Sequence, residues 1–211
     1  MNMNTPLETK TTISNIFKKG YLEIITGPMF SGKTSKLIEI YKQCVFCEIP
    51  VVVINHSSDT RYHDELLSSH DGSMIPCIQT DNLTNIWNTD STEKCEFNNN
   101  QLACYNADII LINEAQFFDN LYTTVVSMLK SNKRIYISGL DGDFKRERFG
   151  EILDLIPMCD SFIKLKSLCG ICKNGTKAIF SLRLTSEKTQ MVIGSTNYVP
   201  VCRECYEKHN K

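Results

Sequence analysis

Blocks of apolar and polar positions alternate along the chain and predict strands and helices in turn. The β-rich run Tyr21–Thr26 ends at a glycine, and residues 33–46 then carry apolar side chains at helical spacing. Three continuous apolar runs have the pattern of strands buried on both faces, and they are Pro50–Asn55, Ala107–Asn113 and Lys133–Gly139. Strands that alternate with helices predict parallel β-α-β units, so the expected fold class is α/β, a parallel sheet flanked by helices.

Three further segments complete this pattern. Residues 117–131 have helical spacing, whereas residues 56–75 are polar and contain glycine, as expected for a loop. The asparagine-rich segment Asn88–Gln101 has the composition of an exposed insertion.

Changes in composition predict three parts of the chain. Residues 1–18 are polar and have the composition of a disordered tail. The pattern changes after about Ser167, where cysteine pairs, glycines and short β-like runs replace the long apolar strands. We therefore expect an α/β domain over residues 19–167 and a small cysteine-rich domain over residues 168–211.

Composition narrows the class of protein. The 211 residues are 42% hydrophobic and 22% charged, which is ordinary for a soluble globular protein. The formal net charge of -1 argues against broad binding to nucleic acid, and no apolar run is long enough to cross a membrane. Because the N-terminal segment lacks a hydrophobic signal core, we expect a cytoplasmic protein, in which the ten cysteines are thiols or metal ligands rather than disulfides.

A phosphate-binding pattern, G-x-x-x-x-G-K-[ST], lies between the first predicted strand and the first predicted helix. In such a loop, backbone N–H groups and the N-terminal end of the helix surround phosphate oxygens. Lys33 supplies charge to the β- and γ-phosphates of a nucleotide, and the Thr34 hydroxyl can bind Mg²⁺. A chance glycine turn is the alternative, and the strand and helix on either side argue against it. The predicted phosphate-binding loop, which would hold the nucleotide, comprises Gly27, Pro28, Met29, Phe30, Ser31, Gly32, Lys33 and Thr34.

Polar residues at the ends of two predicted strands are candidates for catalysis and metal binding. Glu114 follows the strand Ala107–Asn113, where α/β proteins build their sites, so a base or water-positioning role is favoured. Its alternative is a purely stabilising acid at a helix N-terminus. Asp59 follows another buried strand, although Asp59 and Arg61 taken alone would more often form a loop ion pair. The candidate Mg²⁺ ligands are Thr34, Asp59 and Asn113.

Two C-x-x-C pairs lie near the C-terminus, separated by residues 173–201. Four thiolates at such spacing suit a tetrahedral structural Zn²⁺ site with no open position, and free thiols are the alternative. The predicted zinc ligands are Cys169, Cys172, Cys202 and Cys205. A third pair, Cys44 and Cys47, falls in a predicted helix, where two small buried hydrophobes are the better interpretation.

Six segments, taken together, closely resemble the zinc-containing, cytosolic-type thymidine kinases. They are GPMFSGKT, DTRY, SHDG, NEAQFF, GLDGDFKRERFG and the paired cysteines, and they occur in the family's order from Gly20 to about Tyr206. The resemblance implies a P-loop parallel sheet with a small zinc-ribbon-like domain. In that domain a lasso loop, Lys173–Val201, would close over a nucleoside.

The resemblance also implies a reaction and its residues. The γ-phosphate of ATP would pass to the 5′-hydroxyl of thymidine, with deoxyuridine as a second acceptor, and Glu114 would be the general base. Asp59 and Arg61 would lie at the phosphates and the metal. The thymidine-binding set would be Met29, Phe117, Leu140, Phe144, Phe149, Ser181, Val192, Ile193, Gly194 and Tyr198. A homotetramer that is inhibited by thymidine triphosphate is implied as well.

The chain departs from the family pattern at Asn113, where the family usually has Asp immediately before the catalytic Glu. An amide carries no charge, so we expect weaker attraction for Mg²⁺ unless Asp59 compensates. Three alternatives stay open at this point: a P-loop motor or DNA-repair NTPase with a zinc ribbon, a nucleotide sensor without turnover, and a kinase with a shifted acceptor such as deoxyuridine alone.

Overall fold

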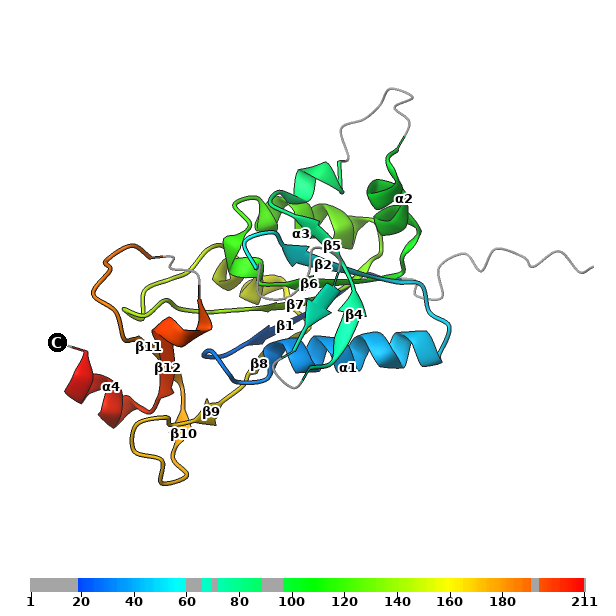
Figure 1. Ribbon diagram of the computed structural model, residues 1–211. Coiled ribbons are helices and arrows are strands. Elements are labelled where there is room, and N and C mark those ends of the chain that lie inside the picture. Colours follow the sequence, from blue (N-terminus) through cyan, green and yellow to red (C-terminus); the bar gives the residue numbers. More distant parts are fainter. Residues whose placement is uncertain (1–18, 60–65, 70–71, 89–96, 191–193, 211) are drawn as a thin grey trace, which may run out of the picture.

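The computed structural model describes residues 19–59, 66–69, 72–88, 97–190 and 194–210 (Figure 1). Its centre is a six-stranded sheet in the order β5-β2-β6-β7-β1-β8, and every neighbouring pair is parallel. The strands are β1 (Tyr21–Thr26), β2 (Val51–His56), β5 (Ile78–Thr80), β6 (Ile109–Asn113), β7 (Arg134–Gly139) and β8 (Ser161–Lys164). The predicted α/β class with a parallel sheet is therefore confirmed.

Helices cover both faces of this sheet (Figure 1). On one face lies α1 (Lys33–Phe46), and on the other lie α2 (Asn99–Asn106), α3 (Leu121–Lys130) and the 3-10 segment η3 (Ile152–Met158). Alternate residues of one strand pack into the two hydrophobic layers, one on each face of the sheet, because successive side chains of a strand point to opposite faces. Thus Leu111 of β6 packs with α1, whereas its neighbour Ile112 packs with α3.

The predicted helix at residues 33–46 is confirmed without a shift as α1, but the helix predicted at 117–131 begins later. Glu114 has left-handed backbone angles, and a 3-10 turn, η2 (Ala115–Phe117), follows it. This turn delays α3 until residue 121.

Two predicted irregular segments contain regular structure. A short antiparallel hairpin, β3 (Leu66–Ser68) with β4 (Met74–Pro76), lies in the expected loop 56–75, because Leu67 and Ile75 are buried against the α1 layer. The insertion expected at 88–101 ends in the first turn of α2, whose N-terminus is closed by a capping box between Asn98 and Gln101. Both predictions were wrong in these parts, and residues 60–65, 70–71 and 89–96 lie outside the described residues, as does the predicted tail 1–18.

The C-terminal part forms a separate small cluster beside the sheet (Figure 1). It consists of two two-stranded sheets and a helix: β9 (Ser167–Leu168) with β10 (Lys177–Ala178), β11 (Phe180–Arg183) with β12 (Tyr198–Val201), and α4 (Arg203–His209). Tyr206 is fully buried in this cluster among three of the paired cysteines. The chain also has the short 3-10 turns η1 (Leu83–Asn85) and η4 (Ser195–Asn197). Across the ranges given above, no helix has the length and apolar character needed to cross a membrane.

Replacing a buried side chain of the central strand tests this layered core. Leu111 is 0% exposed in β6, so Leu111→Ala should lower the free energy of unfolding by about 2–5 kcal/mol through lost burial and a residual cavity. Leu102→Ala on α2, where the side chain is 48% exposed, is the matched control and should change stability by less than about 0.5 kcal/mol. Urea denaturation measures both, and equal losses would contradict the packing described.

Candidate active site

The loop between β1 and α1 has a backbone that only glycine accommodates at two positions. Gly27 has φ 144, and a Cβ there would lie 2.6 Å from the carbonyl oxygen of Leu165 and 2.7 Å from Ser31 Oγ. Gly32, directly before the helix, has φ 87. Both angles are disfavoured for L side chains, which explains the two glycines of the motif.

The interior of this loop is arranged to receive an anion. The Lys33 side chain is 9% exposed, and its Nζ donates to the carbonyl oxygens of Gly27 (3.1 Å) and Pro28 (3.0 Å). The hydroxyl of Ser31 is buried and has no hydrogen-bond partner among the described residues. A buried ammonium and an unsatisfied hydroxyl beside the N-terminus of α1 fit a bound phosphate.

Because the sheet is parallel, the carboxyl ends of its strands meet at one edge, and a cleft lies there. The phosphate loop follows β1, Asp59 follows β2, Glu114 follows β6 and Leu140 follows β7. All four segments line the cleft, whose empty volume is about 1050 Å³ including space open to solvent. The sheet therefore brings together residues that are distant in the sequence.

Most of the residues predicted for nucleotide and nucleoside line this cleft. From the phosphate loop they are Met29, Phe30, Ser31, Gly32, Lys33 and Thr34, together with Asp59. From the thymidine set they are Met29, Phe117, Leu140, Phe144, Phe149, Ser181, Gly194 and Tyr198. Of the predicted phosphate loop, Gly27 and Pro28 are not part of the lining, and Arg61, Val192 and Ile193 lie outside the described residues.

Glu114 is held at the cleft by a glutamine that the sequence reasoning missed. Its left-handed backbone (φ 50, ψ 39) is uncommon for a residue with a side chain. Its Oε2 accepts a hydrogen bond from Gln116 Nε2 at 2.7 Å, and Gln116 Oε1 accepts one from the Leu140 N–H at 2.9 Å. Gln116 thus joins the end of β6 to the end of β7. Its position in the NEAQFF segment, two residues after Glu114, is the sequence feature that could have identified it as a site residue.

Asn113 lies behind the cleft rather than in its lining. The side chain is 1% exposed, its Nδ2 donates to Asn55 Oδ1 at 2.9 Å, and its Oδ1 accepts from the Ser138 hydroxyl at 3.2 Å. Asn55 in turn donates from Nδ2 to Asp59 Oδ2 at 3.4 Å. Of the three predicted Mg²⁺ ligands, the structure thus places Thr34 and Asp59 in the cleft lining and Asn113 in a buried amide network that reaches Asp59.

Aromatic rings form the apolar part of the cleft. Phe117 meets Phe149 edge to face at 5.5 Å, and the His56 ring packs against Phe117 at 5.4 Å and Phe118 at 4.7 Å. Nδ1 of His56 accepts from the Ser58 N–H at 3.1 Å. Burial lowers the pKa of His56, so the ring that supports this wall is neutral near pH 7.

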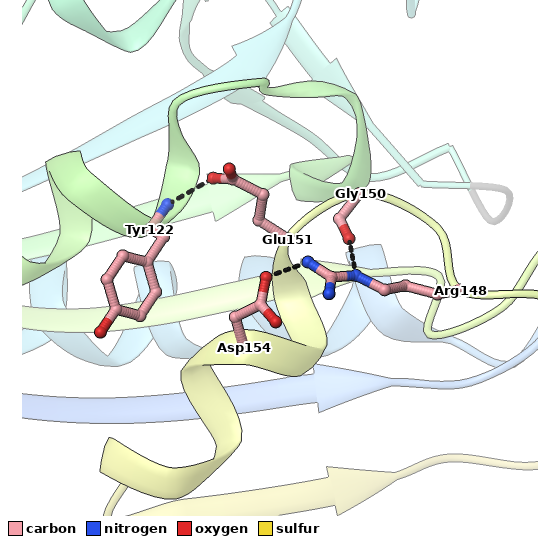
Figure 2. Close-up of polar contacts among 5 residues, drawn as sticks. All are labelled: Tyr122, Arg148, Gly150, Glu151 and Asp154. Atoms are coloured by element: carbon pink, nitrogen blue, oxygen red, sulfur yellow. Dashed lines mark hydrogen bonds and ion pairs between the residues drawn. The ribbon is translucent and has the colours of Figure 1, made fainter.

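Polar contacts hold the residues that precede and follow Phe149 in the chain (Figure 2). Arg148 forms an ion pair with Asp154, and its Nε donates to the Gly150 carbonyl at 2.9 Å. Glu151 accepts from the N–H of Tyr122 at 2.8 Å, which links the segment to α3. These contacts fix the chain on either side of the Phe149 wall.

The four cysteines of the two C-terminal pairs come together. Their sulfur atoms all lie within 4.8 Å of one another, and only Cys172 is exposed. Four sulfurs bound tetrahedrally to Zn²⁺ would be roughly 3.8 Å apart, so the cluster fits that ion. In the third pair Cys44 is buried, as predicted, and burial raises the pKa of its thiol. Cys47, which directly follows α1, is exposed, so its interpretation as a buried hydrophobe was wrong.

The fold and the site define a nucleotide-binding α/β protein of the P-loop class with a four-cysteine cluster that fits a metal ion. Comparison with known proteins is more specific, because the family model for thymidine kinase matches residues 20–206. The chain belongs to the thymidine kinase family.

Three proteins named thymidine kinase illustrate this similarity. That of Oryza sativa subsp. japonica is 36% identical over 190 residues, which are 89% of this chain and 66% of the rice protein. That of Yaba monkey tumor virus (strain VR587) is 37% identical over 194 residues, covering 92% of this chain and 98% of the viral protein. That of Mycoplasma mobile is 35% identical, covering 90% of this chain and 88% of the relative.

The buried histidine behind the ring wall should make stability depend on pH. The pKa of His56 in the folded state is below the ordinary 6.5, so below about pH 6.5 the unfolded chain binds a proton more readily than the folded chain. The contribution of His56 to stability is therefore complete above about pH 6.5 and is lost as the pH falls below that value. His56→Phe keeps the ring contacts and should lose less stability between pH 7 and pH 5 than the wild type.

Thermal melting across this pH range measures the effect. The control is His209→Phe on the exposed end of α4, which should follow the wild type. If His56→Phe has the same pH dependence of stability as the wild type, that dependence comes from other groups, and the prediction is contradicted.

Proposed function

We propose that this chain transfers the γ-phosphate of ATP to the 5′-hydroxyl of thymidine, with deoxyuridine as a second acceptor. The family consists of kinases, and kinases of this family use ATP. The observation that carries the proposal is that one cleft is lined at once by a phosphate loop, by Glu114 and by aromatic rings. The family assignment argues against the alternative of a motor or DNA-repair NTPase.

The phosphate end of the cleft would hold MgATP. Backbone N–H groups of the loop Gly27–Thr34, in which Pro28 has none to offer, would surround the phosphates. Lys33 would leave the loop carbonyls to meet the β- and γ-phosphate oxygens. Thr34 and Asp59 would hold Mg²⁺, which supplies charge compensation to the triphosphate. Asn113 would act indirectly, through Asn55, by orienting the Asp59 carboxylate. Arg61 remains a proposed contact with the phosphates.

The aromatic end would hold the nucleoside. Phe117 and Phe149 offer apolar ring surfaces to a pyrimidine, and Met29 and Leu140 line the same cleft. Main-chain groups around Val192–Gly194 would pair with the edge of the base. A base with a different hydrogen-bonding edge would leave buried groups unpaired, which is a strong basis for discrimination.

Glu114 would act as general base. Its carboxylate accepts the proton of the 5′-hydroxyl while that oxygen attacks the γ-phosphorus in line; the new O–P bond forms as the bond to the β-phosphate oxygen breaks, and ADP leaves. Lys33 stabilises charge on the transferred group. The hydrogen bond from Gln116 orients the base, and the walls of the cleft limit attack by water.

We propose that residues 168–211 form a zinc-binding domain, in which Cys169, Cys172, Cys202 and Cys205 hold a structural ion. The domain reaches the cleft because the Tyr206 hydroxyl donates to the Phe144 carbonyl at 2.5 Å, and because the Met29 N–H donates to Ser181 Oγ at 3.0 Å. A closed four-thiolate site has no position for a substrate, so its role is to hold the lasso loop.

Family resemblance supplies three further proposals. They are a homotetramer, inhibition by thymidine triphosphate bound at the acceptor end, and a cytoplasmic location. We also propose that the protein does not act on nucleic acid, since its formal net charge is -1.

Neutralising the proposed base tests the mechanism. Glu114→Gln keeps the shape of the side chain but cannot accept the proton, so kcat should fall about 10²- to 10⁴-fold. The thymidine dissociation constant, measured by calorimetry, should change by less than about threefold, because the lost interaction belongs to the transition state.

The control for this variant is Glu147→Gln, the same change at an exposed glutamate of the segment that borders the cleft. It should keep near wild-type turnover. Normal turnover by Glu114→Gln would remove Glu114 from the mechanism.

Removal of zinc should weaken substrate binding and leave the central sheet folded. Elemental analysis should find one Zn²⁺ per chain, and a strong chelator should raise the thymidine KM because the loop loses its anchor. Circular dichroism should show the helices retained. Full activity in a zinc-free protein would refute the structural role.

A further inference from the structure

An arginine at the end of β11 is buried beside the cleft. Arg183 is 8% exposed, and its guanidinium donates to carbonyl oxygens of the loop that follows it. Nη1 donates to Glu187 (2.9 Å) and to Thr189, and Nη2 donates to Gln190 (2.8 Å). The Arg183 side chain therefore forms hydrogen bonds with three carbonyl groups of one loop.

The same guanidinium contacts two residues that line the cleft. Its Cζ lies 3.7 Å from the centroid of the Phe144 ring, within the range of a cation–π contact. Its Nε and Nη2 both donate to the hydroxyl of Tyr198. Arg183 thus connects the loop backbone to two side chains of the proposed nucleoside end.

The cost of burying this charge indicates that the position is specialised. In the part of the chain that the structure describes, no acidic side chain forms a salt bridge with Arg183. Loop carbonyls, a hydroxyl and ring faces contact the guanidinium directly, and the exposed carboxylate of Glu187 attracts it without forming a salt bridge. A planar fork of five N–H groups suits this arrangement, whereas the compact ammonium of lysine does not.

A second contact holds the loop from its other side. Gln190 Nε2 donates to Asp143 Oδ2 at 3.0 Å and to the Arg148 carbonyl at 3.1 Å. Asp143 is 6% exposed, and its Oδ1 accepts from the N–H groups of Lys145 and Glu147, so it is itself fixed. Loop residues 184–190 are therefore tied to the turn that carries Phe144.

We propose that Arg183 is a positioning residue that shapes the acceptor end of the cleft before the nucleoside binds. It sets the loop backbone, the Phe144 ring and the Tyr198 hydroxyl in one arrangement, so that binding need not order them. Ordering a loop on binding reduces affinity, and preorganisation avoids that loss. This inference rests on the proposed function, because it assigns the nucleoside to this end.

Steady-state kinetics with both substrates test the proposal. Arg183→Met should raise the thymidine KM about tenfold or more, because the loop must then be ordered on binding. The ATP KM and kcat at saturating thymidine should stay within about threefold of wild type, since the phosphate loop is untouched. Arg183→Lys should not rescue the thymidine KM, because its three donors radiate from one nitrogen.

The matched control is Arg134→Met at the opposite, amino end of β7, where the guanidinium also lies over an aromatic ring, Tyr21, at 4.3 Å. It should leave both KM values unchanged. Tyr198→Phe, which removes only the accepting hydroxyl, should raise the thymidine KM in the same direction as Arg183→Met but by less. Because Tyr198 itself belongs to the proposed thymidine set, the digestion rate of this milder variant, rather than its thymidine KM, decides the matter if Arg183→Met does not fold.

Limited trypsin digestion without nucleoside gives an independent readout. Cleavage after Lys188, in the loop that Arg183 holds, should be at least about tenfold faster in Arg183→Met than in Arg134→Met. An unchanged thymidine KM with unchanged cleavage would overturn the proposal, as would equal rises of both KM values. If the wild type transfers no phosphate to thymidine, the proposed function fails, and the digestion still tests whether Arg183 holds the loop.

Discussion

The parallel pairing of β1, β7, β6 and β2 is the constraint on which the rest of the structure depends. It places the carboxyl ends of these strands at one edge, and each strand delivers one part of the site there. Two hydrophobic layers enforce the pairing, since strands such as β6 are buried on both faces. A change in register would move the phosphate loop away from Glu114, so the core and the chemistry are specified together.

Behind this edge the chain uses neutral polar groups, and Asn113 stands where the family pattern has a carboxylate. Asn55 and Asn113 pair across β2 and β6, where the register places them opposite each other, and Ser138 of β7 completes the set. Satisfied amides cost little to bury, whereas an unpaired carboxylate in the same place would be expensive. The negative charge at the phosphate end is thus left to Asp59, which lies at the surface of the cleft.

Sequence reasoning identified the elements whose signal is local. The helix α1 was predicted to the residue, because a phosphate loop marks its start and a regular apolar face marks its length. The β3–β4 hairpin and α2 were missed, since strands of three residues and a polar helix carry little periodicity. The motifs predicted the lining of the cleft, but no pattern tells whether a residue such as Asn113 faces the cleft or lies behind it. Arg183 was missed for a related reason, because the sequence around an arginine does not show whether its side chain is buried or exposed.

The central claim is that the two ends of the cleft hold the donor and acceptor of one phosphoryl transfer. ATP labelled at the γ-phosphate, incubated with Mg²⁺, the protein and thymidine, tests it most directly. The account predicts label in thymidine 5′-monophosphate in step with ADP, none in deoxycytidine monophosphate, and stable ATP when no nucleoside is present. Release of labelled inorganic phosphate without an acceptor, or bound nucleotide with no transfer to thymidine, would contradict it.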